Sequence, residues 1–233
     1  MPMPPLVSVI VPVKNSARYL AEALDSIARQ TYRPIEIIVV DGHSTDGTPV
    51  IARDFPYPVD IRVQVLTQPH DGLTEALNFG IALSSGALLA FLSSDDRWLP
   101  DKLTAQVVAL QVEPTQSMVI THMRAFAAED YAAKGGQQAR LLGRIYAALL
   151  LETVLVRRTV FDDVGLLDTS YILSADADWF ARAIDKGHTH IILSEVLVEK
   201  RLHEQNLSNQ IDLVQTELLR TLRASAVRRR RTP

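Results

Sequence analysis

The amino-acid sequence predicts an α/β fold with a mostly parallel central sheet that is flanked by helices. Short apolar runs rich in Val and Ile alternate with segments whose apolar residues recur at helical spacing. This alternation fills the first half of the 233-residue chain, and it is typical of a parallel sheet with crossover helices. The composition, 47% hydrophobic and 22% charged, is that of an ordinary globular domain with a sizeable core.

The elements of the first half follow one another in regular order. Four apolar runs predict buried strands, at Leu6–Val13, Ile35–Val40, Ile61–Thr67 and Ala87–Ser93. Four segments predict helices, at Ala17–Gln30, Asp46–Asp54, Leu73–Gly86 and Asp101–Glu113. Thr45 or Asp46 is the expected cap of the second helix, and Gly86 is expected to close the third.

The second half is less regular and predicts a smaller mixed region. We expect a strand at Ser117–Phe126, an exposed loop at Glu129–Gln138, and a short helix that ends in a turn at Gly165. An amphipathic helix follows at Ala175–Gly187, then extended segments, then a terminal helix from Ile211. With neither repeats nor a long linker, we expect residues 1–233 to form a single domain. Its parts would be a binding half at about 6–113, a second half at about 114–210, and a C-terminal helix with a basic tail at 211–233.

Composition excludes several classes of protein. Cysteine is absent, which rules out disulfides and thiolate metal sites and leaves hard cations such as Mg²⁺ or Mn²⁺. The net charge of −3 gives no sign of a nucleic-acid partner. We see neither a signal peptide nor an apolar stretch of membrane-spanning length, so a cytoplasmic location is expected.

Polar clusters follow the predicted strands and point to a ligand site. Lys14–Asn15, Asp41–His43 and Asp95–Asp96 each come after a strand, and the carboxyl ends of parallel strands meet at one edge of the sheet. The adjacent carboxylates of Asp95 and Asp96 suit a divalent cation, or else they cap the helix that begins near Pro100. Asp41 suits a nucleobase N–H, or else holds a turn.

Several of these motifs, in this order, resemble the family 2 inverting glycosyltransferases of the GT-A (Rossmann-like) fold. The resemblance is carried by the first strand with Pro12–Asn15, by Gln30–Tyr32, by the turn from Val40 to Thr48, and by the segment from Ser93 to Lys102. It resumes more weakly from Val164 to Gly187 and from Lys200 to Asn209. Together these segments extend over most of residues 6–210.

The resemblance implies transfer of a sugar from a nucleoside diphosphate sugar, UDP-sugar favoured, to a hydroxyl of a glycan or lipid-linked acceptor, in glycan or polysaccharide synthesis. It implies that the nucleotide-sugar contacts come from the residues Pro12, Val13, Asn15, Asp41, Asp71 and Asp95. It further implies that Asp95, Asp96 and His203 bind Mg²⁺ or Mn²⁺, with Arg201 a candidate for phosphate contact. Asp176 would be the general base that deprotonates the acceptor in a single inverting displacement.

This chain departs from the family pattern at three places. Lys14 stands where the family often has an aromatic residue, Ser93 where it has the first acid of its metal motif, and Ala175 where it has a Glu before the base. A nucleotide-binding member of the same fold without turnover is therefore the alternative. An aspartyl phosphotransferase with Asp41 as nucleophile ranks far lower, because that class needs an acid where His43 stands.

Two further expectations concern charged residues outside the strand ends. Arg182 is expected to orient nearby acids through an ion pair rather than to touch substrate. The basic run Arg228–Arg231 is either a solvated tail or a contact with an anionic membrane surface, which would place the protein peripherally at the inner face of the membrane.

Overall fold

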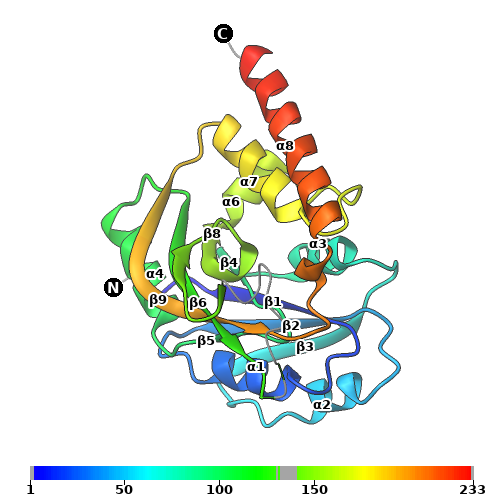
Figure 1. Cartoon of the computed structure of the whole chain (residues 1–233). Coiled ribbons are helices and arrows are strands. Elements are labelled where there is room, and N and C mark those ends of the chain that lie inside the picture. Colours follow the sequence, from blue (N-terminus) through cyan, green and yellow to red (C-terminus); the bar gives the residue numbers. More distant parts are fainter. Residues whose placement is uncertain (1–2, 130, 132–140, 232–233) are drawn as a thin grey trace.

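The protein is built on one curled sheet with helices packed on both sides (Figure 1). The computed structural model describes residues 3–129, 131 and 141–231. Within them, nine strands form a single sheet in the order β3-β2-β1-β4-β8-β6-β9-β5, with β7 paired to β6. The two halves of the chain therefore share one sheet.

The first half has the predicted alternation of strands and helices. The strands β1 (Val7–Val13), β2 (Ile35–Asp41), β3 (Ile61–Thr67) and β4 (Leu88–Phe91) run parallel to one another. The helices are α1 (Leu20–Ala28), α2 (Thr48–Asp54), α3 (Leu73–Leu83) and α4 (Lys102–Val112). These elements confirm the fold class expected from the sequence.

Strand β1 shows why helices cover both faces. Val7, Val9, Val11 and Val13 pack with α1 and α4 in one apolar cluster, whereas Ile10 packs with α3 and the helices of the second half in another. Successive side chains of a strand point to opposite faces, so a strand that is apolar at nearly every position needs cover on both.

The second half adds strands of mixed direction. They are β5 (Arg97–Trp98), β6 (Met118–Ala127), β7 (Ile145–Ala147), β8 (Val154–Arg157) and β9 (His190–Leu202). Strand β8 lies antiparallel to β4 and β6, and the long β9 runs parallel to β6 and antiparallel to β5. The shorter elements are η1 (Leu151–Thr153), α6 (Arg158–Val164), α7 (Ala175–Asp185) and η2 (Leu207–Asn209).

Two expectations at element ends are wrong, and one lies mostly outside the described residues. Helix α3 ends at Leu83, so Gly86 does not close it; a Cβ on Gly86 would lie 2.6 Å from both Leu6 O and Ser8 Oγ, which makes it a site of close approach. Asp95 and Asp96 do not cap a helix, because β5 follows them and α4 begins only at Lys102. The loop expected at Glu129–Gln138 lies outside the described residues except for residues 129 and 131.

Helix α8 (Ile211–Arg231) packs on α7 and extends away from the sheet (Figure 1). Its inward face is polar. Glu217 accepts three backbone N–H groups of residues 172–174, and Arg228 and Arg229 pair with Asp185. Among the described residues, no helix is long and apolar enough to cross a membrane.

Candidate active site

The loop after β1 and the turn after β2 lock together at the carboxyl edge of the sheet. The Asn15 side chain accepts the Thr45 N–H at 2.8 Å, and the Asn15 N–H donates to Ser44 Oγ at 2.9 Å. Asp41 is buried, and its two carboxylate oxygens accept the Ser44 N–H at 3.3 and 3.2 Å. Both Asn15 and Asp41 therefore organise the turn, which is the turn-holding role that the sequence left open for Asp41.

The predicted nucleotide contacts Pro12, Val13 and Asp71 have different surroundings. Val13 is buried, whereas Pro12 lines a pocket described below. Asp71 is exposed; its Oδ1 lies 3.4 Å from Lys14 Nζ and 3.2 Å from His43 Nδ1. Hydrogen bonding by His43, and then the charge of Lys14, lower the pKa of Asp71. The structure therefore places a cation, Lys14, beside two of the residues predicted to contact the nucleotide, Asn15 and Asp71.

Asp95 and Asp96 form the turn between β4 and β5, and the end of β9 holds this turn in place. The Arg201 N–H donates to Asp96 Oδ1 at 2.8 Å, and Arg201 Nε donates to the carbonyl oxygen of Asp95 at 2.9 Å. The guanidinium also pairs with Glu22 and lies over the rings of Tyr19 and Phe126. Arg201 is 6% exposed, so its side chain positions the acids in this structure.

His203, predicted as a metal ligand, is hydrogen-bonded to Asp95. His203 Nε2 lies 2.9 Å from Asp95 Oδ2, and Asn206 Nδ2 donates to the same oxygen at 3.2 Å. Burial alone would raise the pKa of Asp95, but the His203 hydrogen bond and the charge of Lys200 outweigh it and lower the pKa. Asp95 is therefore held as a carboxylate, and the imidazole orients it.

Asp96 presents one buried oxygen without a hydrogen-bond partner among the described residues. This oxygen is Oδ2, and the Nζ of Lys200 lies 3.7 Å from it as a counter-charge. Burial, with added repulsion from Asp95 and Glu152, raises the pKa of Asp96 to about 7 despite the charge of Lys200. A buried carboxylate oxygen without a hydrogen-bond partner is costly, and an ion that binds there is one explanation for such an atom in a native site.

These residues fit a divalent cation whose remaining ligands come from the substrate. In the described part of the chain, no three His, Asp or Glu side chains form a ready-made metal cluster. Mg²⁺ is often held by one or two carboxylates together with substrate phosphates, and Asp95 and Asp96 supply such a pair. The observation that favours an ion here is that Asp96 Oδ2 has no hydrogen-bond partner among the described residues.

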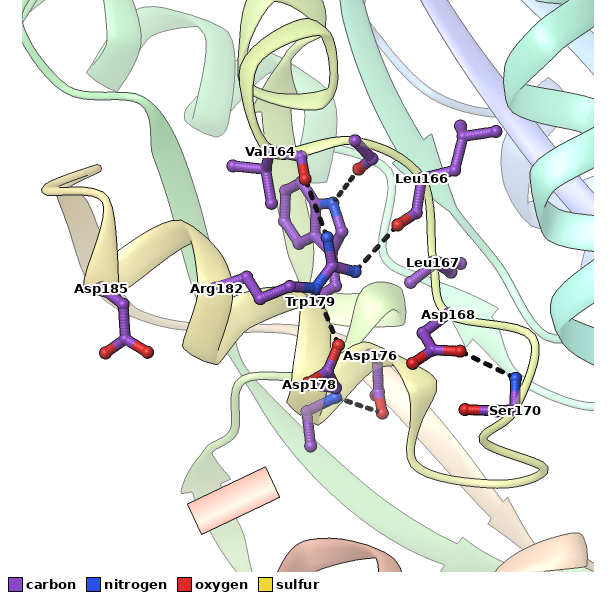
Figure 2. Close-up of polar contacts among 12 residues, drawn as sticks. Val164, Leu166, Leu167, Asp168, Ser170, Asp176, Asp178, Trp179, Arg182 and Asp185 are labelled. Atoms are coloured by element: carbon purple, nitrogen blue, oxygen red, sulfur yellow. Dashed lines mark hydrogen bonds and ion pairs between the residues drawn. The ribbon is translucent and has the colours of Figure 1, made fainter. Parts of the chain in front are cut away.

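Asp176 lies in the first turn of α7 (Figure 2). Its Oδ1 accepts the Ala177 N–H at 2.7 Å. Figure 2 also shows Arg182 donating to Asp178 Oδ2 at 2.8 Å and to the carbonyl oxygens of Val164 and Leu166. This ion pair is the role that the sequence predicted for Arg182. Burial, followed by repulsion from Glu152, raises the pKa of Asp176 to about 7.

One pocket lies between the two halves of the chain, at the ends of β1 and β4. It is lined by residues from the end of β1, from α3, from the end of β4, from η1 and from the start of α7, and among them are Pro12, Ser93, Glu152 and Asp176. Ser93 Oγ donates to Glu152 Oε1 at 2.5 Å. The expected base therefore faces the same pocket as the strand end that leads into Asp95 and Asp96.

Two charged residues of this site were missed in the sequence. Glu152 is the lone acid of an apolar run, which was the one available signal. Lys200 begins the segment Lys200–Asn209 that resembles the family, but the resemblance implied no role for it. The charges of Asp96, Glu152 and Asp95 all raise the pKa of Lys200, with Asp96 acting most strongly. The ammonium thus balances an acidic cluster that only the fold assembles.

Comparison with known proteins agrees with this architecture. The family model described as Glycosyl transferase family 2 matches residues 8–161. A PGL/p-HBAD biosynthesis glycosyltransferase of Mycobacterium tuberculosis is 30% identical over 219 residues, covering 94% of this chain and 84% of its own. Glycosyltransferase AglE of Haloferax volcanii is 33% identical over 207 residues, which cover 83% of this chain. An uncharacterised glycosyltransferase of Rickettsia typhi is 31% identical over 219 residues, which cover 88% of this chain. This chain spans only 66% of that protein and 66% of AglE.

Solved structures share the fold at low identity. S. aureus TarS residues 1–349, in complex with UDP-GlcNAc, has a TM-score of 0.74 at 20% identity, covering 95% of this chain and 66% of its own. The mannosyltransferase PcManGT of Pyrobaculum calidifontis, in complex with GDP-Man and Mn²⁺, has a TM-score of 0.75 at 22% identity, covering 97% and 65%. The fold is that of these proteins, and with the match over residues 8–161 the chain belongs to glycosyl transferase family 2.

Proposed function

We propose that the protein is an inverting glycosyltransferase that moves a sugar from a nucleoside diphosphate donor to an acceptor hydroxyl. One observation carries the proposal: the pocket that contains Asp176 is also lined by Ser93, whose strand end leads into Asp95 and Asp96. An acid on one side of a pocket, with a strand end that leads into a carboxylate pair on the other, suits a displacement in which the acceptor is deprotonated opposite the leaving diphosphate.

Each residue has a defined task in this proposal. Asp176 takes the proton of the acceptor hydroxyl as the oxygen attacks the anomeric carbon, so that one displacement inverts the configuration. Its raised pKa makes it a stronger base than an ordinary carboxylate. Asp95 and Asp96 would hold Mg²⁺ or Mn²⁺, and a bound ion neutralises charge on the diphosphate.

On the nucleotide side, we propose that the walls are Pro12, Val13, Asn15 and Asp41, with Asp71 and Lys14 at the rim. A carboxylate such as Asp41 accepts from a ring N–H, which uracil provides and guanine also provides. We favour UDP-sugar, and the two structural relatives, described with UDP-GlcNAc and with GDP-Man, define the comparison to make. A glycan or lipid-linked acceptor, as in polysaccharide synthesis, completes the proposed reaction.

Calorimetry with UDP and GDP, each with and without Mn²⁺, tests the donor site. We expect one nucleotide to bind in a Mn²⁺-dependent manner, and the Asp95→Ala/Asp96→Ala double variant to lose that binding. Absence of binding by either nucleotide, with or without Mn²⁺, would exclude the proposal. Binding without turnover of any donor would instead favour the alternative, a member of the family that binds nucleotide but does not catalyse.

We also propose that helix α8 contacts an anionic membrane surface, through exposed leucines and a neighbouring arginine rather than through its basic tail alone. Arg228 and Arg229 pair with Asp185, so the tail is not simply solvated. Leu219 and Leu222, by contrast, are 54% and 65% exposed, and the exposed Arg223 stands next to Leu222 in the sequence. Apolar side chains beside arginines suit a helix lying at the surface of a bilayer that contains acidic lipids.

Co-sedimentation with vesicles tests this contact. We expect binding to vesicles of phosphatidylglycerol but not of phosphatidylcholine, reduced by Leu219→Glu/Leu222→Glu. The matched control is Val50→Glu/Val59→Glu, which places the same charges on exposed valines of the first half. Equal sedimentation of wild type and the Leu219→Glu/Leu222→Glu variant would rule out α8 as the contact.

A further inference from the structure

Glu152 is a carboxylate inside the proposed active site that no sequence motif marks. It belongs to η1, directly before β8, and it lines the pocket that also contains Asp176. Its backbone is fixed, because Trp98 Nε1 donates to the Glu152 carbonyl oxygen at 3.2 Å. The side chain therefore enters the site from a rigid element of the second half of the chain.

Glu152 supplies an acid where the family pattern has lost one. Ser93 stands at the position of the first acid of the metal motif, and its hydroxyl donates to Glu152 Oε1 at 2.5 Å. Ala175, which replaces the other common acid, lines the same pocket and is buried. Two motif positions thus lack an acid, and the pocket instead receives a carboxylate from Glu152, which lies 59 positions further along the chain than Ser93.

The charge of Glu152 is not neutralised by a direct ion pair in the described part of the chain. The charge of Glu152 acts to raise the pKa of both Lys200 and Lys102. Lys200 Nζ, however, lies next to Asp96 Oδ2, and the buried Lys102 Nζ donates to Gln106 Oε1 at 2.9 Å. Glu152 in turn adds to the raised pKa of Asp96 and of Asp176. A carboxylate that faces a pocket in this state attracts hydroxyl donors and repels phosphate oxygens.

We propose that Glu152, oriented by Ser93, accepts a hydrogen bond from a hydroxyl group of the donor sugar. This inference rests on the proposed function and makes Glu152 a specificity-determining residue. The diphosphate is excluded as the partner because both groups are negative, and a neutral, hydroxyl-rich ring is the part of a nucleotide-sugar that suits a carboxylate acceptor. The remaining carboxylate oxygen, Oε2, is the one that is available to the sugar, because Ser93 occupies Oε1.

The test compares nucleotides with their sugar conjugates. Calorimetry would use UDP, UDP-glucose, UDP-galactose, UDP-GlcNAc, GDP and GDP-mannose with Mn²⁺, on wild type, Glu152→Gln and Ser93→Ala. For the donor that wild type prefers, we expect Glu152→Gln to weaken binding by about tenfold or more, since a site built to hydrogen-bond a hydroxyl loses discrimination when its acceptor changes. Binding of the free diphosphate should not weaken, because the amide removes a charge that repels phosphate oxygens. Ser93→Ala should weaken only the sugar conjugate, and by a smaller factor.

Matched variants separate this role from a structural one. Glu195→Gln makes the same change on an exposed acid of β9 and should leave both affinities unaltered. The exchange variant Ser93→Asp/Glu152→Ser returns the acid to the motif position and should recover part of the affinity for the sugar conjugate. Circular dichroism and thermal unfolding show whether each variant is folded, and Ser93→Ala tests the proposal independently if Glu152→Gln does not fold.

Several results would overturn the inference. Equal weakening of the free diphosphate and its sugar conjugate, or a matching loss of Mn²⁺ affinity, would place Glu152 on the nucleotide or the cation instead. A wild-type protein that binds every conjugate as tightly as its diphosphate has no sugar-hydroxyl site of this kind. If wild type binds no nucleotide at all, the proposed function fails together with this inference, whereas an unaltered Glu152→Gln variant overturns the inference alone.

Discussion

The backbone N–H of Arg201 donates to Asp96 Oδ1 at 2.8 Å, across 105 residues of sequence. The side chain of the same residue holds the carbonyl oxygen of Asp95 and pairs with Glu22 of α1. One residue at the end of β9 therefore fixes the orientation of both acids on the β4–β5 turn. A turn that carries two adjacent carboxylates needs such support, because their mutual repulsion opposes the compact arrangement.

Replacement of Arg201 should cost both stability and ligand binding. We expect Arg201→Met to lower the free energy of unfolding by about 2–4 kcal/mol, because it removes a buried guanidinium that pairs with Glu22 and holds the Asp95 carbonyl oxygen. Nucleotide affinity in the presence of Mn²⁺ should fall by about tenfold or more, since the acid pair loses its orientation. Urea unfolding and calorimetry measure the two effects. Arg223→Met, on the exposed side of α8, is the control and should change neither quantity.

Asp176 should be required for turnover but not for donor binding. We expect Asp176→Asn to reduce the rate of sugar transfer by about 100- to 10,000-fold, the usual contribution of a general base. The affinity for the donor should remain within a few-fold of wild type, because the amide keeps the size of the side chain. Transfer assays combined with calorimetry of the same preparation check this expectation. A variant that retains wild-type turnover would show that another group takes the proton.

The rate should depend on pH with an acid limb near neutrality. Asp176 acts as a base only when ionised, and burial raises its pKa to about 7. We therefore expect kcat to fall as the pH drops below about 7 and to level off above it. The profile should be recorded at saturating Mn²⁺, because the pKa of Asp96 is also raised to about 7 in the ion-free protein and a bound cation lowers the pKa of its ligands. A rate that stays flat from pH 5 to 8 would contradict the assignment of Asp176.

The same raised pKa has a cost in stability whose sign can be checked. The native pKa of Asp176 lies above its usual value of 3.8, so the native state binds this proton more tightly than the unfolded state. The ionised carboxylate therefore destabilises the native state progressively from about pH 4 to about pH 7, and then by a constant amount. We expect Asp176→Asn to raise the free energy of unfolding by about 1–3 kcal/mol at pH 8, and not at pH 4. Denaturant unfolding at the two pH values measures the difference.

Gly86 should tolerate no side chain. A Cβ at this position would lie 2.6 Å from Leu6 O and Ser8 Oγ and 2.8 Å from Ser8 N, all next to the buried Glu36 carboxylate, which accepts the Ser8 hydroxyl at 2.6 Å. We expect Gly86→Ala to destabilise the protein by about 1–3 kcal/mol through overpacking. Gly47→Ala is the matched control, because its nearest neighbour atom would be 3.9 Å away, and it should cost less than about 1 kcal/mol. Thermal and urea unfolding of both variants would reveal whether the close approach is rigid.

The order of strands and helices in the first half could be predicted from local chemistry. The valine and isoleucine runs of β1 and β2 are apolar on both faces, and only a buried parallel strand accommodates such a run. The carboxyl ends of parallel strands lie at one edge, and this geometry predicts that Asn15, Asp41 and Asp95 lie on one side of the sheet. The motif resemblance then assigned their chemistry. These features depend on short-range patterns, which is why one sequence suffices to predict them.

Only the tertiary structure decided how the acids of the site are balanced. The residues that contact Ser93, Asp95 and Asp96 lie 59 to 106 positions further along the chain; they are Glu152, Lys200 and Arg201. They come from a region whose strands run in mixed directions, where no periodic pattern in the sequence specifies which strands are neighbours. Gly86 likewise looked like a helix end, and its actual role depends on the approach of β1. Sequence alone predicted which strand ends carry polar side chains at one edge of the sheet. The electrostatic environment of each carboxylate depends on burial and on distant charges, and these exist only once the chain has folded.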